Sequence, residues 1–168
     1  MPYTVISLGG VACGLGIIVM FAVRWYFKER RSYVALIPFV FALLYGMLAA
    51  LSAYNSISAL GAITWLAIWA GNFAGHVGLV WGVGGEDRNV TRATPLVLDS
   101  GGYVVLFLLT LVMIALFLWA RKHIPAGKIA AGALAGALLS LAGTIAGIAA
   151  VPLASAVNAL GSPITTYF

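Results

Sequence analysis

The chain has 168 residues, of which 63% are hydrophobic and only 8% are charged, and its formal net charge is +5. Soluble domains carry about 25% charged residues, so this composition excludes a soluble globular fold. A positive net charge can indicate nucleic acid binding, but here the basic residues flank apolar stretches, which favours anchoring at an anionic membrane surface. We therefore expect an all-α, polytopic transmembrane helical bundle whose partner is the lipid bilayer, with no nucleic acid bound and no soluble domain.

All charged residues fall into three clusters, within residues 24–31, 86–99 and 121–128. A charge at mid-bilayer costs about 3 kcal/mol or more, so a chain in lipid places its charges in loops. Each uncharged stretch between the clusters is long enough for a crossing, which takes about 20 residues. These stretches predict one integral-membrane domain over residues 1–168, with about five spans and a C-terminal tail: 5–27, 33–53, 57–83, 103–120 and 129–151, then 152–168.

A polar triplet and a proline set limits to the second, third and fifth spans. The uncharged stretch 32–85 is too long for one crossing, and it divides at the turn-forming triplet Tyr54-Asn55-Ser56. The last apolar stretch is also too long, and Pro152 lies one span length into it. Asp99 and Ser100 precede the fourth span, where they are plausible N-cap residues.

Orientation follows from the basic residues that should anchor the chain at the membrane surface. With the N-terminus outside, six basic residues lie in cytoplasmic loops and three lie outside, which predicts a plasma (inner) membrane protein with a cytoplasmic C-terminus. The loop 121–128 then faces outward against the positive-inside rule. A re-entrant segment 57–83 would instead place both strongly basic loops in the cytoplasm. The expected anchors are Arg24, Lys28, Arg30, Arg31, Arg121, Lys122 and Lys128.

The third span carries polar residues at helical spacing. Trp65, Trp69, Asn72 and His76 fall on one helical face, and no carboxylate lies within the span to pair with the histidine. One interpretation is a polar track for a proton or ion, since an ionisable residue in lipid faces the bundle interior or a water-filled path. The other is that Asn72 and His76 form hydrogen bonds between helices and hold the bundle together.

The sequence predicts no cofactor and no metal. His76 and His123 are expected near opposite ends of the fourth span, so they cannot bind one haem, and Cys13 is a single cysteine. The fragment Asp99–Gly102 resembles the surroundings of a nucleophilic serine, but helix capping explains the same residues.

The fifth span contains small residues at four-residue spacing, which let helix backbones approach closely. The face can serve self-assembly, docking of another subunit, or packing within the same bundle. The residues concerned are Gly132, Gly136, Ser140, Gly143, Thr144 and Gly147.

Taken together, these patterns favour a non-enzymatic integral-membrane subunit, a small helical bundle that joins a homo-oligomeric or multi-protein complex. The alternative is a small channel or transporter with a polar path along the third segment, at Asn72 and His76. An enzyme is the least favoured class, because four carboxylates and two histidines, mostly in loops, leave few catalytic pairs.

Overall fold

The architecture comes from a computed structural model, which describes residues 5–55, 58–92, 96–119, 126–143 and 147–166. The structure is 80% helical, and no strands are present within these residues. Four helices are long and apolar enough to cross a membrane, and a shorter apolar helix joins them, which confirms the predicted all-α membrane bundle. The elements are α1 (Leu8–Phe27), α2 (Tyr33–Asn55), α3 (Ala59–His76), the π-helical turn η1 (Val77–Gly82), α4 (Ser100–Trp119), α5 (Ala126–Ser140) and α6 (Ala150–Thr166).

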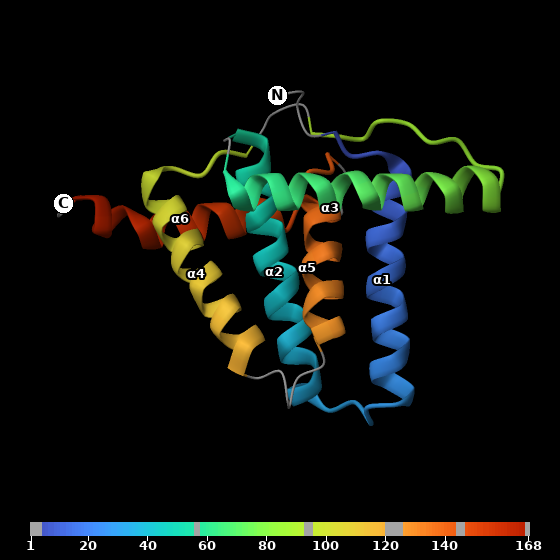
Figure 1. Ribbon diagram of the computed structural model, residues 1–168, viewed down its shortest axis with the longest axis horizontal. Helices are drawn as coiled ribbons and strands as arrows, with labels where there is room; N and C mark the ends of the chain where they lie inside the picture. Colours follow the sequence, from blue (N-terminus) through green and yellow to red (C-terminus); the bar gives the residue numbers. More distant parts are fainter. Residues whose placement is uncertain (1–4, 56–57, 93–95, 120–125, 144–146, 167–168) are drawn as a thin grey trace.

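The helices form two sets with different directions (Figure 1). Helices α1, α2, α4 and α5 run along the bundle, whereas α3 and α6 lie across one of its ends. The contacts of α3 agree with this view, because Gly71 meets Leu138 near the end of α5 and Gly75 meets Gly9 at the start of α1. We call this end, with α3, α6, residues 5–7 and the linker 83–99, the platform. The opposite end, with residues 28–32 and the start of α5, is the basic end.

The prediction of a single fifth span over residues 129–151 is wrong. Helix α5 ends at Ser140, and residues 150–166, most of which were expected as a tail, form α6. Pro152 lies in the first turn of α6, where its missing N–H removes no helical hydrogen bond. Between the two helices the backbone bonds to the linker: Leu141 O accepts from Arg92 N at 2.9 Å, and Gly143 N donates to Val90 O at 2.9 Å.

Helices α2 and α5 form the centre of the bundle through reciprocal contacts. A Cβ added to Gly46 would clash with the backbone of Ala133, and one added to Gly136 would clash with the backbone of Leu43. Because lipid chains are as apolar as leucine, such close backbone contacts supply dispersion energy that lipid does not match. The Ser140 hydroxyl, buried at this contact, donates to the carbonyl oxygen of Met47 at 2.8 Å.

The two halves of the chain, α1–α2–α3 and α4–α5–α6, repeat one arrangement. Residues Val5–Gly10 (VISLGG) precede and open α1, and residues Val97–Gly102 (VLDSGG) precede and open α4. In Figure 1, α2 and α5 run in the same direction along the bundle, while α3 and α6 run in opposite directions across it. This is the relation that a twofold axis along the bundle produces, as in membrane proteins built from parallel repeats.

Both ends of the described chain lie at the platform end of the bundle (Figure 1). The helices along the bundle, α1, α2, α4 and α5, are not the same set as the four long apolar helices, because the long α3 lies across the bundle and the shorter α5 runs along it. With α1, α2, α4 and α5 along the bundle, the chain returns to its starting side. The basic end agrees with this arrangement, because Lys128 at the start of α5 forms an ion pair with Glu29 in the α1–α2 turn. Lys128 therefore lies at the same end of the bundle as the basic residues of the α1–α2 turn.

Candidate functional site

The candidate site lies where α3 crosses the start of α1. Gly9 and Gly75 touch through their backbones, and a Cβ on Gly9 would lie 2.6 Å from the carbonyl carbon of Gly75. No side chain fits between the two helices at this point. The absence of side chains lets α3 come close enough for its polar residues to reach the backbone that precedes α1.

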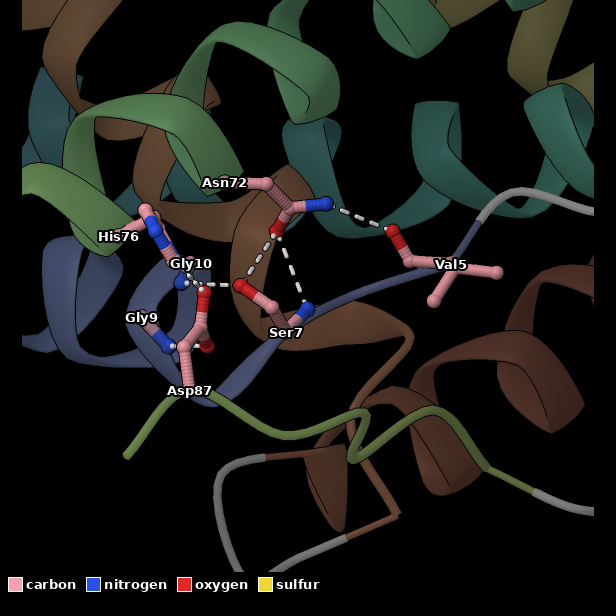
Figure 2. Close-up of polar contacts among 7 residues, drawn as sticks. All are labelled: Val5, Ser7, Gly9, Gly10, Asn72, His76 and Asp87. Atoms are coloured by element: carbon pink, nitrogen blue, oxygen red, sulfur yellow. Dashed lines mark hydrogen bonds and ion pairs between the residues drawn. The ribbon is translucent and has the colours of Figure 1, made fainter. Parts of the chain in front are cut away.

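Asn72 binds the segment before α1 through both atoms of its amide group (Figure 2). Its Nδ2 donates to Val5 O at 2.7 Å, and its Oδ1 accepts from Ser7 N at 3.1 Å and from Ser7 Oγ at 3.4 Å. Ser7 is the N-cap of α1, and its hydroxyl accepts from Gly10 N at 3.1 Å. Asn72 thus satisfies backbone groups that the start of a helix leaves without partners.

His76 has a carboxylate partner, contrary to the expectation from the sequence. Its Nδ1 lies 3.0 Å from Oδ2 of Asp87, which comes from the linker, and Asp87 Oδ1 accepts from Gly9 N at 2.8 Å (Figure 2). The Asp87 side chain is 9% exposed and that of His76 is 46% exposed. The histidine therefore lies at the boundary of the platform rather than in a closed interior, and the carboxylate is the buried member of the pair.

The pKa of Asp87 is lower than that of an ordinary aspartate. Burial of the carboxyl group acts to raise the pKa, but the hydrogen bond from Gly9 N, the hydrogen bonds from His76 and Ser7, and the electrostatic interaction with His76 outweigh burial. The carboxylate also lies at the N-terminus of α1, where the helix dipole favours a negative charge. Asp87 is therefore ionised at neutral pH.

The linker continues this hydrogen bonding along the platform. Val90 N donates to Ile6 O at 3.0 Å, and Thr91 Oγ1 accepts from Ile6 N at 2.8 Å. Arg92 then reaches the break after α5, where its Nη2 donates to Gly147 O at 2.7 Å. The linker thus joins the segment before α1 to the segment between α5 and α6.

The second half carries the same connection in a simpler form. Asn158 Nδ2 donates to Val97 O at 3.3 Å, and Asn158 Oδ1 accepts from Asp99 N at 3.2 Å. Asp99 caps α4 by accepting from Gly102 N at 2.6 Å, as the sequence predicted. The backbones of Gly101 and Gly161 meet here as those of Gly9 and Gly75 do in the first half. Among the described residues, no histidine–carboxylate pair like that of His76 and Asp87 lies at this second crossing.

The order of the polar groups at the first crossing differs from that of a serine hydrolase triad. A serine–histidine–aspartate triad needs the histidine between the serine and the carboxylate, whereas here Asp87 lies between Ser7 and His76. Within the described parts of the chain, no group of three or more histidine, cysteine, aspartate or glutamate side chains is placed to hold a metal. The polar groups join α3 to the start of α1 and pair the carboxylate of Asp87 with His76.

The other two residues of the expected polar track lie apart from this cluster. Trp65 and Trp69 are exposed, at 42% and 60%, and Trp69 stacks on Phe73 with ring centroids 6.1 Å apart. They therefore extend the surface of α3, while Asn72 and His76 face the start of α1.

The small residues of the expected fifth span are divided by the break after α5. Gly132 and Gly136 pack on α2, within the same chain, while Gly143 and Gly147 lie between α5 and α6 against Arg92. Thr144 falls outside the described residues. A single helical face that carries all of these small residues does not exist.

The expected surface anchors gather at the basic end where they are described. Arg24 and Lys128 both contact Glu29, and the Arg31 guanidinium lies 4.1 Å from the centroid of the Tyr26 ring. Lys28 and Arg30 are exposed. Arg121 and Lys122 fall outside the described residues.

The sequence prediction missed Asp87, Ser7 and Asn158. The repeated pattern of valine, an apolar residue, a capping residue and a glycine pair was present at Val5–Gly10 and Val97–Gly102, and two Asn-x-x-Gly fragments, at 72–75 and 158–161, accompany it. A search for internal repeats would have found both. No local signal pairs Asp87 with His76, because a turn of the linker brings them together.

Comparison with protein-family models, with curated proteins and with solved structures finds no match for this chain.

Proposed function

We propose that the protein is a non-enzymatic integral-membrane subunit that assembles with itself or with another membrane protein through the outer face of α3. We define this face by four exposed apolar side chains, Ile63, Leu66, Trp69 and Phe73. The opposite side of α3 packs on the bundle through Gly61, Thr64, Ile68, Gly71 and Gly75. The outer face is the observation that carries the proposal.

The depth of α3 argues that lipid chains alone do not cover this face. Helix α5 has 15 residues and is about 22 Å long, which leaves roughly 8 Å of a hydrocarbon core about 30 Å thick. The diameter of α3 fills that distance, so its outer face reaches the membrane boundary. Asp87 and Arg92, which belong to the platform, form hydrogen bonds with Gly9 and Gly147 at this membrane boundary. An uncovered apolar face beside charged groups is typical of a protein–protein contact.

The proposed topology has four crossings, with α3 and α6 at the outer boundary. Five described basic residues lie at the basic end and two, Arg88 and Arg92, at the platform, so the positive-inside rule places the basic end in the cytoplasm. Both chain ends then lie outside. In a Cys13→Ser background, the variants Ser32→Cys and Gly127→Cys should both resist an impermeant thiol reagent in intact cells. Labelling of one and protection of the other would indicate a full crossing by α3.

The alternative function, a channel or transporter, has less support from this arrangement. A path along the centre would pass between α2 and α5, where Gly46 and Gly136 bring the backbones into contact. Asn72 and His76 are engaged with Ser7 and Asp87 at the platform. A pH-sensitive dye in reconstituted liposomes tests this alternative, and a proton flux that is lost in His76→Gln would favour it over the subunit proposal.

Site-specific photo-crosslinking tests the subunit proposal. A photoreactive phenylalanine analogue at Leu66 should give protein–protein adducts in intact membranes, whereas the same analogue at Leu111, on the exposed side of α4, should not. Two differently tagged copies distinguish self-association from a second protein. If neither Leu66 nor Phe73 gives an adduct with protein, lipid covers α3 and the proposal fails.

A further inference from the structure

We infer that the groove between α1 and α5 at the basic end binds an anionic phospholipid. The groove has a volume of about 310 Å³ and opens to the surface of the bundle. Four residues of α1 and three of α5 line it: Ile17, Met20, Phe21, Arg24, Gly127, Lys128 and Ala131.

The lining of the groove has an apolar part, which suits an acyl chain, and a basic part, which suits a phosphate group. The floor is apolar, and Phe21 is held in place by stacking on Phe39, with ring centroids 3.8 Å apart. Both charged residues of the lining, Arg24 and Lys128, are basic. A Cβ added to Gly127 would have nothing within 4 Å, so the mouth of the groove is open beside the lysine.

Lys128 is fixed at the mouth of the groove. Its side chain is 13% exposed, its ammonium lies 5.7 Å from the centroid of the Phe21 ring, and it pairs with Glu29. Arg24 contacts the same carboxylate through Nε at 3.6 Å. One carboxylate between two basic groups leaves a net positive charge, and it holds both groups at the same mouth. Lys28, Arg30 and Arg31 add positive charge at this end.

The size, apolar floor and basic mouth of the groove favour an anionic lipid over other occupants. A second protein helix is too wide for a groove of this volume, and a neutral lipid makes no use of two basic groups. Basic pockets between membrane helices on the cytoplasmic side are typical sites for anionic headgroups, and the inference rests on the proposed topology for placing the basic end on that side. The phosphate lies at the mouth of the groove, beside the Arg24 and Lys128 groups that Glu29 holds together, and one acyl chain lies along Ile17 and Met20.

Native mass spectrometry of the full chain tests this inference, with dioleoylphosphatidylglycerol and dioleoylphosphatidylcholine added in equal amounts in detergent. We expect preferential retention of one phosphatidylglycerol. The variants Arg24→Gln and Lys128→Gln should each lower that retention about fivefold, because a basic group near a lipid surface contributes about 1 kcal/mol. Lys128→Arg keeps the charge and should retain the lipid. Ala131→Leu fills the floor without changing charge and should lower retention.

Lys28→Gln is the matched control, because Lys28 is exposed at the same end but does not line the groove. It should leave retention unchanged, and a thermal unfolding scan should find Lys128→Gln folded. An equal loss in Lys28→Gln would mean diffuse surface charge and would overturn the inference. Equal retention of both lipids, or displacement of the lipid by glycerol phosphate at equal concentration, would also overturn it. If Lys128→Gln does not fold, Arg24→Gln and Ala131→Leu carry the test.

Discussion

The two halves of the molecule share one helix crossing and differ in what surrounds it. In each half, an Asn-x-x-Gly fragment on a helix across the bundle meets the capped start of a helix along it. In the first half, Asp87 pairs with His76 at the crossing, and α3 carries an aromatic outer face. In the second half, α6 is shorter, and its exposed residues include Ser155, Ser162 and Pro163.

The comparison distinguishes contacts that stabilise the helix crossing from features that the crossing does not need. The contacts that both halves keep are those that any helix crossing at a membrane boundary needs, namely close backbones and satisfied helix ends. The additions of the first half, a titratable pair and an apolar face, are not needed for the crossing, because the second half forms without them. We therefore place function in the first half of the platform, and the following predictions test that division.

The largest effect is expected at the crossing glycines. Gly75→Leu and Gly161→Leu each force a side chain into a backbone contact and should lower the free energy of unfolding by about 3 kcal/mol. Thermal unfolding in detergent measures the loss. Gly78→Leu is the control, since a Cβ there has nothing within 4 Å. Tolerance of Gly161→Leu at the level of the control would show that the second crossing is not close-packed.

Asn72→Ala should cost more than Asn158→Ala. Asn72 makes three hydrogen bonds, of 2.7, 3.1 and 3.4 Å, and Asn158 makes two, of 3.2 and 3.3 Å. Loss of the amide removes these hydrogen bonds, each of which contributes about 1 kcal/mol or less, so we expect about 2 kcal/mol for Asn72 and about 1 kcal/mol for Asn158. Urea unfolding in mild detergent compares the two variants. The reverse order would contradict the stronger connection in the first half.

Asp87→Asn should remove a pH dependence that belongs to the first half. Because the folded pKa lies below the unfolded value, the stabilisation is present above about pH 4 and is lost as pH falls through the folded pKa. Wild type should therefore exceed Asp87→Asn by about 1.5 kcal/mol at pH 7, and the difference should shrink below pH 4. Unfolding at several pH values measures it. The exposed Glu86, changed to Gln, is the control and should give no such difference.

The smallest effect on stability is expected on the outer surfaces of α3 and α6. Leu66→Ala and Leu160→Ala remove exposed side chains, so each should change the free energy of unfolding by less than about 0.5 kcal/mol. Only Leu66→Ala should weaken the assembly that crosslinking detects. Equal weakening by Leu160→Ala would remove the distinction between the two surfaces.

The sequence by itself determined the fold class, the helix-rich architecture and the position of the charged loops. Charge is excluded from lipid and helices satisfy their own backbone, so composition and the spacing of charges suffice for these features. The N-cap of α4 at Asp99 and the small residues that meet α2 were also visible, since both depend on short-range spacing.

Only the tertiary structure decided the direction of α3 and the break after Ser140. Length and hydropathy make both α1 and α3 candidate membrane spans, so they do not show that α3 lies across the other helices. The contact between Gly9 and Gly75, the pairing of His76 with Asp87 and the hydrogen bonds from Val90 and Arg92 to the break after α5 join residues far apart in the chain. Such contacts depend on where each loop returns, which no local pattern of residues specifies.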